Sequence, residues 1–338
     1  VMTWNAMDLL PYEHKLNIGR PGVVALRAPN FAIQNSDLLI SIGSRLDNII
    51  TAFDPKNFAR SAKKIIIDID KNELKNLNVK FDFKVNDNVK NFLAWADKKN
   101  IFYNFQWRNK NAFKTMNWYE PKLNNKPNSN IFIRKLTKKI NGKTCIIVDG
   151  GGTALYAGFQ SSILKEGNKI ICSSSISSMG TGLAETIGVS KSKNFSKLIC
   201  IIGDGSFLMN IQDLQSIKSL NIPVVICVIN NNGYLAIRHT QKEFLNGNFY
   251  GTHPKWSLEM PSIKKIAKGF DIDYLKLDKS KNIISYVEKL IKKNKPIICE
   301  VIVDEEEKEL FSQGYLANKD GSFTPLSLDK MEPKLELK

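Results

Sequence analysis

Two short motifs contain the residues best suited to chemistry, Gly203-Asp204-Gly205-Ser206 and Asn230-Asn231-Asn232-Gly233. A carboxylate and an amide oxygen, together with backbone carbonyls at a glycine turn, are the hard oxygen ligands that Mg²⁺ or Ca²⁺ prefers. Glycine lets the backbone approach a phosphate closely, and the amides of Gly205 and Ser206 open a helical segment, where an anion is favoured. The two motifs therefore predict a diphosphate held through a metal ion.

The segments around these motifs predict how they are positioned. Apolar runs from Leu198 to Ile202 and from Val224 to Ile229 precede the first and the second motif, and between them apolar residues recur at helical spacing, at Ile211, Leu214, Ile217 and Leu220. Strand, helix and strand in this order form a βαβ unit whose strands are parallel neighbours in one sheet. Asp204 and Asn231 then both follow the carboxyl ends of strands, where open α/β sheets bind ligands.

Gly-Asp-Gly followed by Asn-Asn, with Asn231 27 positions after Asp204, resembles the signature of thiamine-diphosphate-dependent enzymes. The resemblance extends over nearly the whole chain, to the carboxyl-terminal portion of the acetolactate-synthase-like branch. It implies that Asp204, the side chain of Asn231 and the carbonyl of Gly233 bind Mg²⁺. An ordinary βαβ turn with a capping aspartate is the alternative explanation of these motifs.

Further cofactor contacts are implied by the same resemblance. A predicted strand from Thr144 to Val148 ends in three glycines, which indicate a close backbone approach to a ligand, and in the family this loop lies over the diphosphate. Met179 matches the bulky apolar residue that holds thiamine diphosphate bent, although a methionine in the core is the alternative. The implied cofactor-binding residues are Gly151, Gly152, Thr153, Ser178, Met179, Gly203, Gly205, Ser206, Asn231, Tyr234 and Leu235.

The activity implied by the resemblance is thiamine-diphosphate- and Mg²⁺-dependent decarboxylation of a 2-oxo acid such as pyruvate, with transfer of the two-carbon unit to an acceptor. Thr153 and Ala154 stand where glutamine and histidine are usual, and Thr240 stands where acetolactate synthases carry a tryptophan that helps to select the acceptor. The acceptor therefore stays open, and a keto-sugar of surface-polysaccharide synthesis is one alternative. A non-catalytic nucleotide-binding module is an alternative of another class, and His239 faces either the substrate or the surface.

Catalysis in the family also requires a glutamate from the pyrimidine-binding domain of a neighbouring subunit. The recognised motifs contain no such residue, because Asp149, Asp204 and Glu185 all belong to the diphosphate side. We therefore expect the chain that begins at Val1 to be a fragment without this catalytic glutamate and its domain. Such a fragment is expected to be inactive alone, and the active enzyme to be a homodimer or homotetramer.

The expected fold class is α/β, with two parallel-sheet domains. Residues 1–98 are interpreted as a partial central domain of the nucleotide- or flavin-cleft type, 99–128 as a linker, 129–304 as the thiamine diphosphate and Mg²⁺ domain, and 305–338 as a tail or lid. Short helices are expected over 29–35, 55–60 and 86–98. FAD is allowed by the resemblance, since some relatives bind flavin and others do not, and Arg45 is either a phosphate contact or an exposed strand-end residue.

Composition distinguishes between broader classes of function, including nucleic-acid and membrane binding. The net charge is +16, but the lysines are spread through the chain in pairs such as Lys63-Lys64 and Lys264-Lys265, which favours a solvated surface over a nucleic-acid or membrane partner. Aromatic and basic residues alternate in the linker, a pattern that also occurs in nucleic-acid binding, at Trp107, Arg108, Lys110, Lys114, Trp118 and Tyr119. Packing of these aromatics against the domains is the interpretation that fits the resemblance.

The five cysteines lie in strand-like apolar runs without CxxC spacing. Reduced, buried thiols in a cytoplasmic protein explain this distribution. No apolar run approaches the ~20 residues of a membrane-spanning helix, and no basic stretch leads into an apolar one at the start of the chain, as a signal peptide requires.

Overall fold

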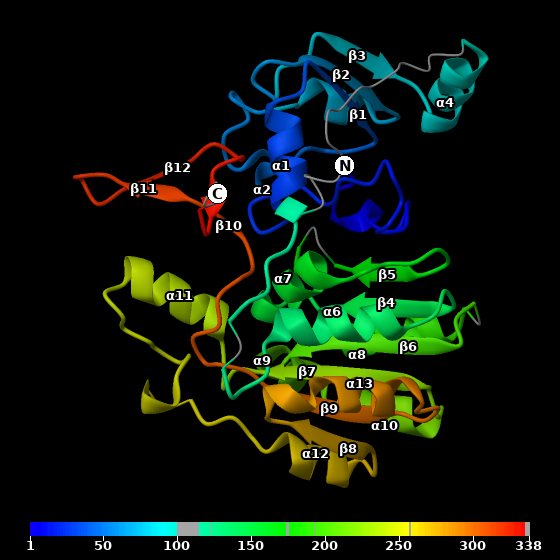
Figure 1. Ribbon diagram of the computed structural model, residues 1–338, viewed down its shortest axis with the longest axis vertical. Helices are drawn as coiled ribbons and strands as arrows, with labels where there is room; N and C mark the ends of the chain where they lie inside the picture. The colour runs from blue at the N-terminus through cyan, green and yellow to red at the C-terminus, as the bar shows by residue number, and fades with distance from the viewer. Residues whose placement is uncertain (100–114, 123, 174–175, 193, 257, 335–338) are drawn as a thin grey trace. The chain divides into compact units, whose positions relative to one another are not determined.

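The computed structural model describes residues 1–99, 115–122, 124–173, 176–192, 194–256 and 258–334 (Figure 1). The chain forms two compact units, each described here by itself. The first contains 1–3, 15–119 and 311–338, and the second contains 4–14 and 120–310. The predicted stacking residues Trp107, Arg108, Lys110 and Lys114 lie outside the described residues.

A parallel sheet forms the centre of the second unit, with strand order β5-β4-β6-β7-β9-β8 (Figure 1). Apart from the edge strand β8, which contains Asp273 and Lys276, its strands are almost continuous apolar runs, as expected where helices cover both faces of a sheet. Their bounds are β4 (Thr144–Val148), β5 (Lys169–Cys172), β6 (Lys197–Gly203), β7 (Val224–Asn230), β8 (Asp273–Leu277) and β9 (Ile297–Ile302).

Helices cover both faces of this sheet. On one face α6 (Ser129–Lys139) contacts α7 (Gly152–Ser161) and α13 (Ile283–Ile291). On the other, α8 (Thr181–Ser190), α10 (Asp213–Ser219) and α12 (Ile263–Gly269) bury apolar residues against the strands. The remaining helices, α9 (Asp204–Phe207) and α11 (Leu235–Phe244), directly follow β6 and the turn after β7. The predicted α/β class with parallel sheets is confirmed.

The predicted βαβ unit is present at the centre of the sheet. Strands β6 and β7 are parallel neighbours, with Gly203 opposite Ile229 near their carboxyl ends. Between them α10 buries Leu214 and Ile217 completely, whereas Leu220 remains half-exposed just beyond the end of the helix. The two chemical motifs therefore emerge from adjacent strands at the same edge.

Residues 4–14 pack against the outer strand β5 of this sheet. The carboxylate of Asp8 accepts a hydrogen bond of 3.0 Å from the amide of Ile170 and pairs with the ammonium of Lys169 at 2.8 Å. The segment begins with a 3₁₀ turn at Trp4–Ala6, and Trp4 packs on Phe159. Aromatic burial against α7 accounts for this packing.

The first unit contains a second parallel sheet of order β1-β2-β3. Its elements are α1 (Arg27–Gln34), β1 (Leu38–Ile42), α2 (Asn48–Thr51), β2 (Lys63–Asp68), α3 (Lys71–Lys75), β3 (Phe83–Asn86) and α4 (Val89–Lys98). The helix expected over 55–60 is wrong, because those residues form turns. Strand β3 was not predicted: Asn88 caps α4 by accepting a hydrogen bond from Lys90, so the helix begins at Val89 and leaves 83–86 to pair with β2.

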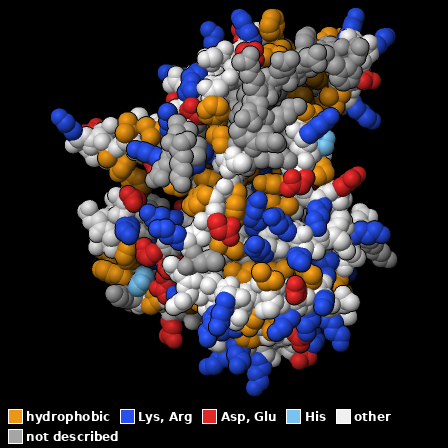
Figure 2. Space-filling view, in the orientation of Figure 1, with side chains coloured by type: hydrophobic (Ala, Val, Ile, Leu, Met, Phe, Trp, Pro, Cys, Tyr) orange, Lys and Arg blue, Asp and Glu red, His pale blue; other side chains and the backbone are white. Residues whose placement is uncertain are grey.

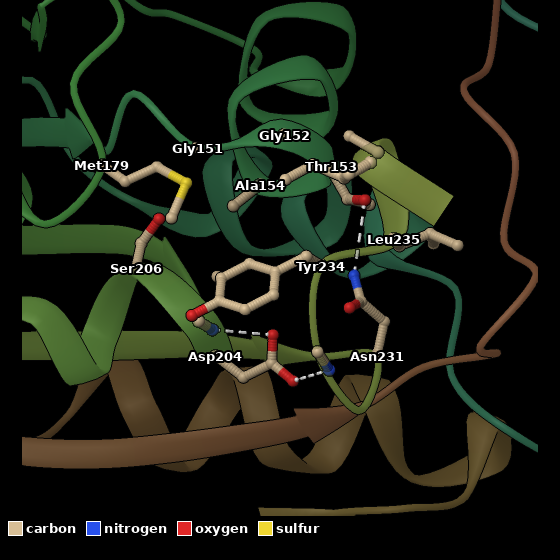
Figure 3. Close-up of a pocket in the computed structure, with 15 residues that line it drawn as sticks. Gly151, Gly152, Thr153, Ala154, Met179, Asp204, Ser206, Asn231, Tyr234 and Leu235 are labelled. Carbon is tan, nitrogen blue, oxygen red and sulfur yellow. Dashed lines mark hydrogen bonds between the residues drawn. The ribbon is translucent and has the colours of Figure 1, made fainter. Parts of the chain in front are cut away.

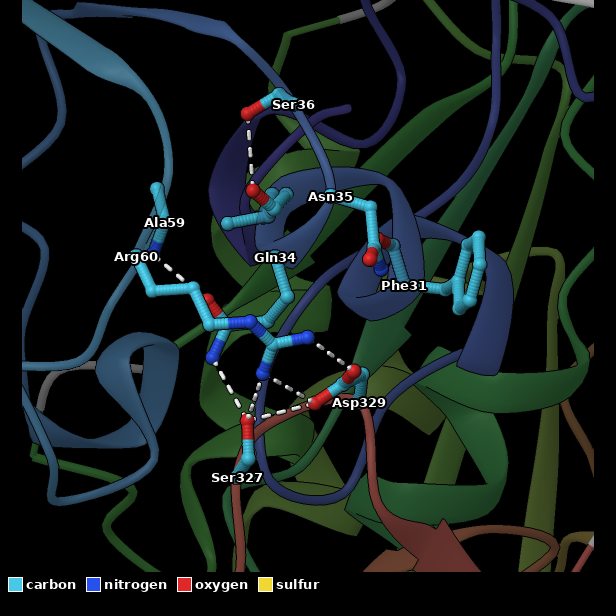
Figure 4. Close-up of polar contacts among 9 residues, drawn as sticks. Phe31, Gln34, Asn35, Ser36, Ala59, Arg60, Ser327 and Asp329 are labelled. Atoms are coloured by element: carbon cyan, nitrogen blue, oxygen red, sulfur yellow. Dashed lines mark hydrogen bonds and ion pairs between the residues drawn. The ribbon is translucent and has the colours of Figure 1, made fainter.

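The chain from Phe311 onward packs within the first unit. It contains two short antiparallel pairs, β10 (Ser312–Gln313) with β13 (Met331–Glu332), and β11 (Tyr315–Ala317) with β12 (Phe323–Pro325). Figure 4 shows its anchor: Arg60 pairs with Asp329 at 2.9 Å, and both Arg60 and Gln34 donate to the hydroxyl of Ser327 at 3.0 Å. The proposed boundaries at 98, 128 and 304, and the role of this segment as a lid, remain predictions.

Surface charge follows the scattered pattern of the sequence. On the face shown in Figure 2, Lys and Arg side chains are distributed over both units and lie among Asp and Glu side chains. Within the described residues, no helix has the length and apolar character that crossing a membrane requires.

Candidate functional site

A cavity of about 90 Å³ lies at the carboxyl ends of β4, β6 and β7 in the second unit (Figure 3). Every predicted metal- and cofactor-binding residue lines it except Ser178, which is exposed. Its lining is Gly151, Gly152, Thr153, Ala154, Met179, Gly203, Asp204, Gly205, Ser206, Asn231, Gly233, Tyr234, Leu235, Ala236 and Ile237. Two motifs and two further loops thus meet in one place.

Asp204 is fixed at the base of this cavity. The residue is 2% exposed, and its carboxylate accepts hydrogen bonds from the amide of Gly205 at 2.9 Å and from the amide of Gly233 at 2.8 Å. Burial raises the pKa of Asp204 to about 7, against the lowering effect of these two amides and of the nearby Arg238. A bound cation would favour the ionised carboxylate.

Asn231 provides the clearest test of whether a cation fits. Its side chain is buried, and its amide nitrogen donates to the hydroxyl of Thr153 at 3.4 Å, but its Oδ1 has no hydrogen-bond partner among the described residues. A buried carbonyl oxygen without a partner is costly. Beside the carboxylate of Asp204, an unpaired hard oxygen is the donor set that a divalent cation requires. The residues present therefore fit a Mg²⁺ ion.

The glycines of the site allow loops to touch. A Cβ on Gly205 would overlap the ring of Tyr234, and a Cβ on Gly151 would overlap the hydroxyl of Ser206 and lie 3.2 Å from Cγ of Met179. Gly233 has a φ of +127°, which side-chain-bearing residues rarely adopt. In Figure 3 the ring of Tyr234 lies centrally among these loops.

Asp149 joins two of the loops, a role not predicted from the sequence. It follows β4, is fully buried, and accepts hydrogen bonds from the amides of Gly151 at 3.1 Å and Gly182 at 3.0 Å. Burial raises the pKa of Asp149, while these amides and the hydroxyl of Ser206 lower it. Its position at a strand end, directly before the glycines, was a signal that could have revealed it.

Arg238 is a second residue that sequence reasoning missed. Its guanidinium binds backbone carbonyls of the turn after β7, including that of Asn231 at 2.8 Å. Asn230, the last residue of β7, donates to the carboxylate of Glu300 at 2.6 Å, and Tyr274 donates to the same carboxylate. An arginine in an amphipathic helix usually faces solvent, so no pattern in the sequence indicated its burial.

Other residues singled out in the sequence lie away from the cavity lining. Thr240 is exposed and donates to the carbonyl of Ala236, one turn earlier on α11, while Ala236 and Ile237 themselves line the cavity. His239 lies 3.7 Å from the carboxylate of Glu309. In the first unit, Arg45 is largely exposed and pairs with Glu73 at 3.3 Å.

Comparison with known protein families gives two matches. Residues 149–301 match the model described as "Thiamine pyrophosphate enzyme, C-terminal TPP binding domain", and residues 1–95 match "Thiamine pyrophosphate enzyme, central domain". The first match begins at Asp149 and contains all of the cavity-lining residues. Together the two matches cover most of the chain.

Curated relatives agree with these matches. The chain is 28% identical to a probable acetolactate synthase large subunit from Methanococcus aeolicus, over 86% of the chain and 51% of the relative. It is 27% identical to the acetolactate synthase large subunit of Lactococcus lactis, over 92% and 53%, and 26% identical to the isozyme 1 large subunit of Escherichia coli, over 91% and 54%. The chain thus spans about half the length of the curated relatives it matches.

Proposed function

This chain belongs to the thiamine pyrophosphate enzyme family, and we propose that it provides the diphosphate- and Mg²⁺-binding part of an acetolactate-synthase-like carboligase. The observation that carries this proposal is the unpaired, buried Oδ1 of Asn231, which belongs to the same cavity as the carboxylate of Asp204.

Each part of the cavity has a role in the proposal. Asp204, Asn231 Oδ1 and the carbonyl of Gly233 would hold Mg²⁺, because together they offer one carboxylate and two neutral oxygens, and Mg²⁺ completes its shell with waters and phosphate oxygens. Gly151 and Gly205 would let the backbone approach the diphosphate closely, while their own amides hold the carboxylates of Asp149 and Asp204. The backbone amides of Gly152, Thr153 and Ser206 would bind the diphosphate.

Apolar residues of the cavity would orient the rest of the cofactor. Met179 and Leu235 line the cavity together with Tyr234, and the absence of a side chain at Gly151 and Gly205 leaves room for Met179 and for the ring of Tyr234. These side chains would exclude water from the reacting atoms. Thiamine diphosphate, when bound, supplies the chemistry for decarboxylating a 2-oxo acid such as pyruvate and for transferring the two-carbon unit.

The acceptor, further partners and location are parts of the same proposal. A second 2-oxo acid is the acceptor suggested by the relatives' names, and Thr240 at the tryptophan position keeps a keto-sugar as the alternative. A pyrimidine-binding domain outside residues 1–338 would complete each site across a homodimer or homotetramer interface. The resemblance allows FAD in the first unit without requiring it. The cytoplasm is the proposed location, as the free cysteines favour.

The proposal is tested by incubating the full-length protein with pyruvate, thiamine diphosphate and Mg²⁺ and identifying products by nuclear magnetic resonance. Acetolactate is the expected product, and parallel reactions with keto-sugars test the alternative acceptor. Binding of thiamine diphosphate without carbon dioxide release from any 2-oxo acid would instead favour the non-catalytic module.

A further inference from the structure

Arg238 is the largest of the fully buried side chains in the described part of the chain. Its Nη1 donates to the carbonyls of Thr252 at 2.8 Å and Asn232 at 3.3 Å, and its Nη2 donates to the carbonyls of Asn231 at 2.8 Å and Glu305 at 3.0 Å. The guanidinium is therefore held by backbone carbonyls from three separate segments. Burying an arginine is unfavourable. Because Nε of Arg238 has no hydrogen-bond partner among the described residues, the four bonds of the other two nitrogens require an explanation.

We infer that Arg238 is a positioning residue of the proposed metal site. Its hydrogen bonds orient the turn after β7 so that the carbonyl of Gly233 can bind the cation. This inference rests on the proposed function. Its central observation is that Arg238 and Asp204 hold one and the same peptide unit: the carbonyl of Asn232 accepts from Arg238, and the amide of Gly233 donates to Asp204.

The preceding peptide unit is also held at both ends. The carbonyl of Asn231 accepts from Arg238 at 2.8 Å, and the amide of Asn232 donates to the side chain of Asn230 at 2.9 Å. Two consecutive peptide planes therefore have fixed orientations. The next carbonyl along the chain is that of Gly233, and no described residue donates a hydrogen bond to it. This oxygen is therefore available to bind a cation.

The geometry requires an arginine rather than any cation. Two nitrogens of a planar guanidinium, separated by a fixed angle, reach carbonyls of two consecutive residues at the same time. A lysine at 238 would supply its charge and all its donors from a single nitrogen, without the fixed fork that orients both planes. Charge alone therefore does not explain the contacts.

The test uses calorimetric titration of thiamine diphosphate into the full-length protein at a series of Mg²⁺ concentrations. Arg238→Met and Arg238→Lys should each raise the Mg²⁺ concentration for half-maximal binding by about tenfold or more, as expected for loss of an oriented ligand worth roughly 1.4 kcal/mol. The matched control is Gln241→Met on the same helix. Gln241 is also buried and bonds to the carbonyl of Tyr250 and the hydroxyl of Thr252, but to no carbonyl of the metal turn.

Thermal unfolding without Mg²⁺ separates folding from positioning. If the Arg238 variants and Gln241→Met lower the melting temperature alike and none changes the Mg²⁺ requirement, Arg238 is only structural and the inference is wrong. A normal Mg²⁺ requirement in Arg238→Lys would also overturn the inference. If Arg238→Met does not fold, the test is made with Arg238→Lys alone. Failure of the unsubstituted protein to bind thiamine diphosphate at any Mg²⁺ concentration would instead contradict the proposed function itself.

Discussion

The carboxylate of Asp204 accepts a hydrogen bond of 2.8 Å from the backbone amide of Gly233, 29 residues later in the chain. This bond joins the two motifs across neighbouring strands, because β6 and β7 end side by side. It also leaves the carbonyl of Gly233 and the side-chain oxygen of Asn231 free of donors within the described structure. The protein's own hydrogen bonds thus hold the residues around these oxygens, and such pre-organisation favours tight binding.

Replacing Gly205 should disturb the cavity from within. In Gly205→Ala, the new methyl group overlaps the ring of Tyr234, so the ring or the backbone must move, at a cost of roughly 1–3 kcal/mol. Gly188→Ala is the matched control, because a Cβ there meets nothing within 4 Å and alanine favours a helix by about 0.5–1 kcal/mol. Urea unfolding should show loss of stability in the first variant and none in the second; equal stabilities would contradict the packing described.

Glu307 should make the stability of the second unit depend on pH. Burial raises its pKa from 4.5 to about 7, although the amide and hydroxyl of Ser129 donate to its carboxylate. The folded state then binds more protons than the unfolded state between these values, so this group's stabilising contribution is complete below pH 4.5 and is lost as the pH rises through 7.

Glu307→Gln should therefore reduce the loss of unfolding free energy between pH 5 and 8, by roughly 1–3 kcal/mol. Contributions from other groups, including Asp204, are common to both proteins and cancel in the comparison. Glu306→Gln is the control, since Glu306 is exposed and pairs only at the surface with Lys242. An unchanged pH profile in Glu307→Gln would show that Glu307 is ionised throughout.

The side chain at position 240 is expected to influence the choice of acceptor substrate more than the decarboxylation of the donor substrate. Thr240 lies four residues after the cavity-lining Ala236 on α11, so both occupy one helix face, and a larger side chain at 240 could extend over that residue. In the full-length protein, Thr240→Trp should change the ratio of products from competing acceptors more than it changes carbon dioxide release from pyruvate. Lys242→Trp, on another face of the helix, should change neither, and equal effects of Thr240→Trp on both measurements would place residue 240 away from the acceptor.

The centre of the site was predictable because local rules determine it. A βαβ unit has parallel neighbouring strands, so residues that follow two such strands must meet at one edge, as Asp204 and Asn231 do. The glycine loop after β4 and Met179 line the same cavity, while their contacts with a cofactor stay predictions. Helix α7, which begins at Gly152 within that loop, was not predicted, since glycine usually ends rather than begins a helical pattern.

Residues that act through long-range packing could not be predicted. Arg238 is polar at a position where helical periodicity predicts solvent, and only the fold shows that carbonyls from three segments surround it. The packing of Asp8 on β5 and of Asp329 on Arg60 joins parts of the chain that are distant in sequence and carry no local pattern. Ser178, predicted from its neighbour Met179, lies outside the cavity lining, and its backbone lies close to Gly150.

Residues 1–338 alone are expected to release no carbon dioxide from pyruvate. Among the described residues that line the cavity, Asp204 has the one carboxylate, and backbone amides hold it at the proposed metal position. In our proposal the proton-transferring glutamate belongs to a pyrimidine-binding domain outside these residues. Assays should compare this chain with the full-length protein at equal thiamine diphosphate and Mg²⁺ concentrations, and comparable rates would show that the chain contains its own glutamate or a substitute.

The most direct test of the metal site is calorimetric binding of thiamine diphosphate to the full-length protein and to Asp204→Ala, each with excess Mg²⁺ and with a chelator. Asp271→Ala is the control, because Asp271 is an exposed carboxylate of the same unit that pairs with Lys218. We predict Mg²⁺-dependent binding by the unsubstituted protein and the control, and affinity lowered by more than about tenfold in Asp204→Ala, or roughly 1.4 kcal/mol. Equal affinity in Asp204→Ala, or binding that persists in chelator, would contradict the assignment of this cavity as a metal-dependent diphosphate site.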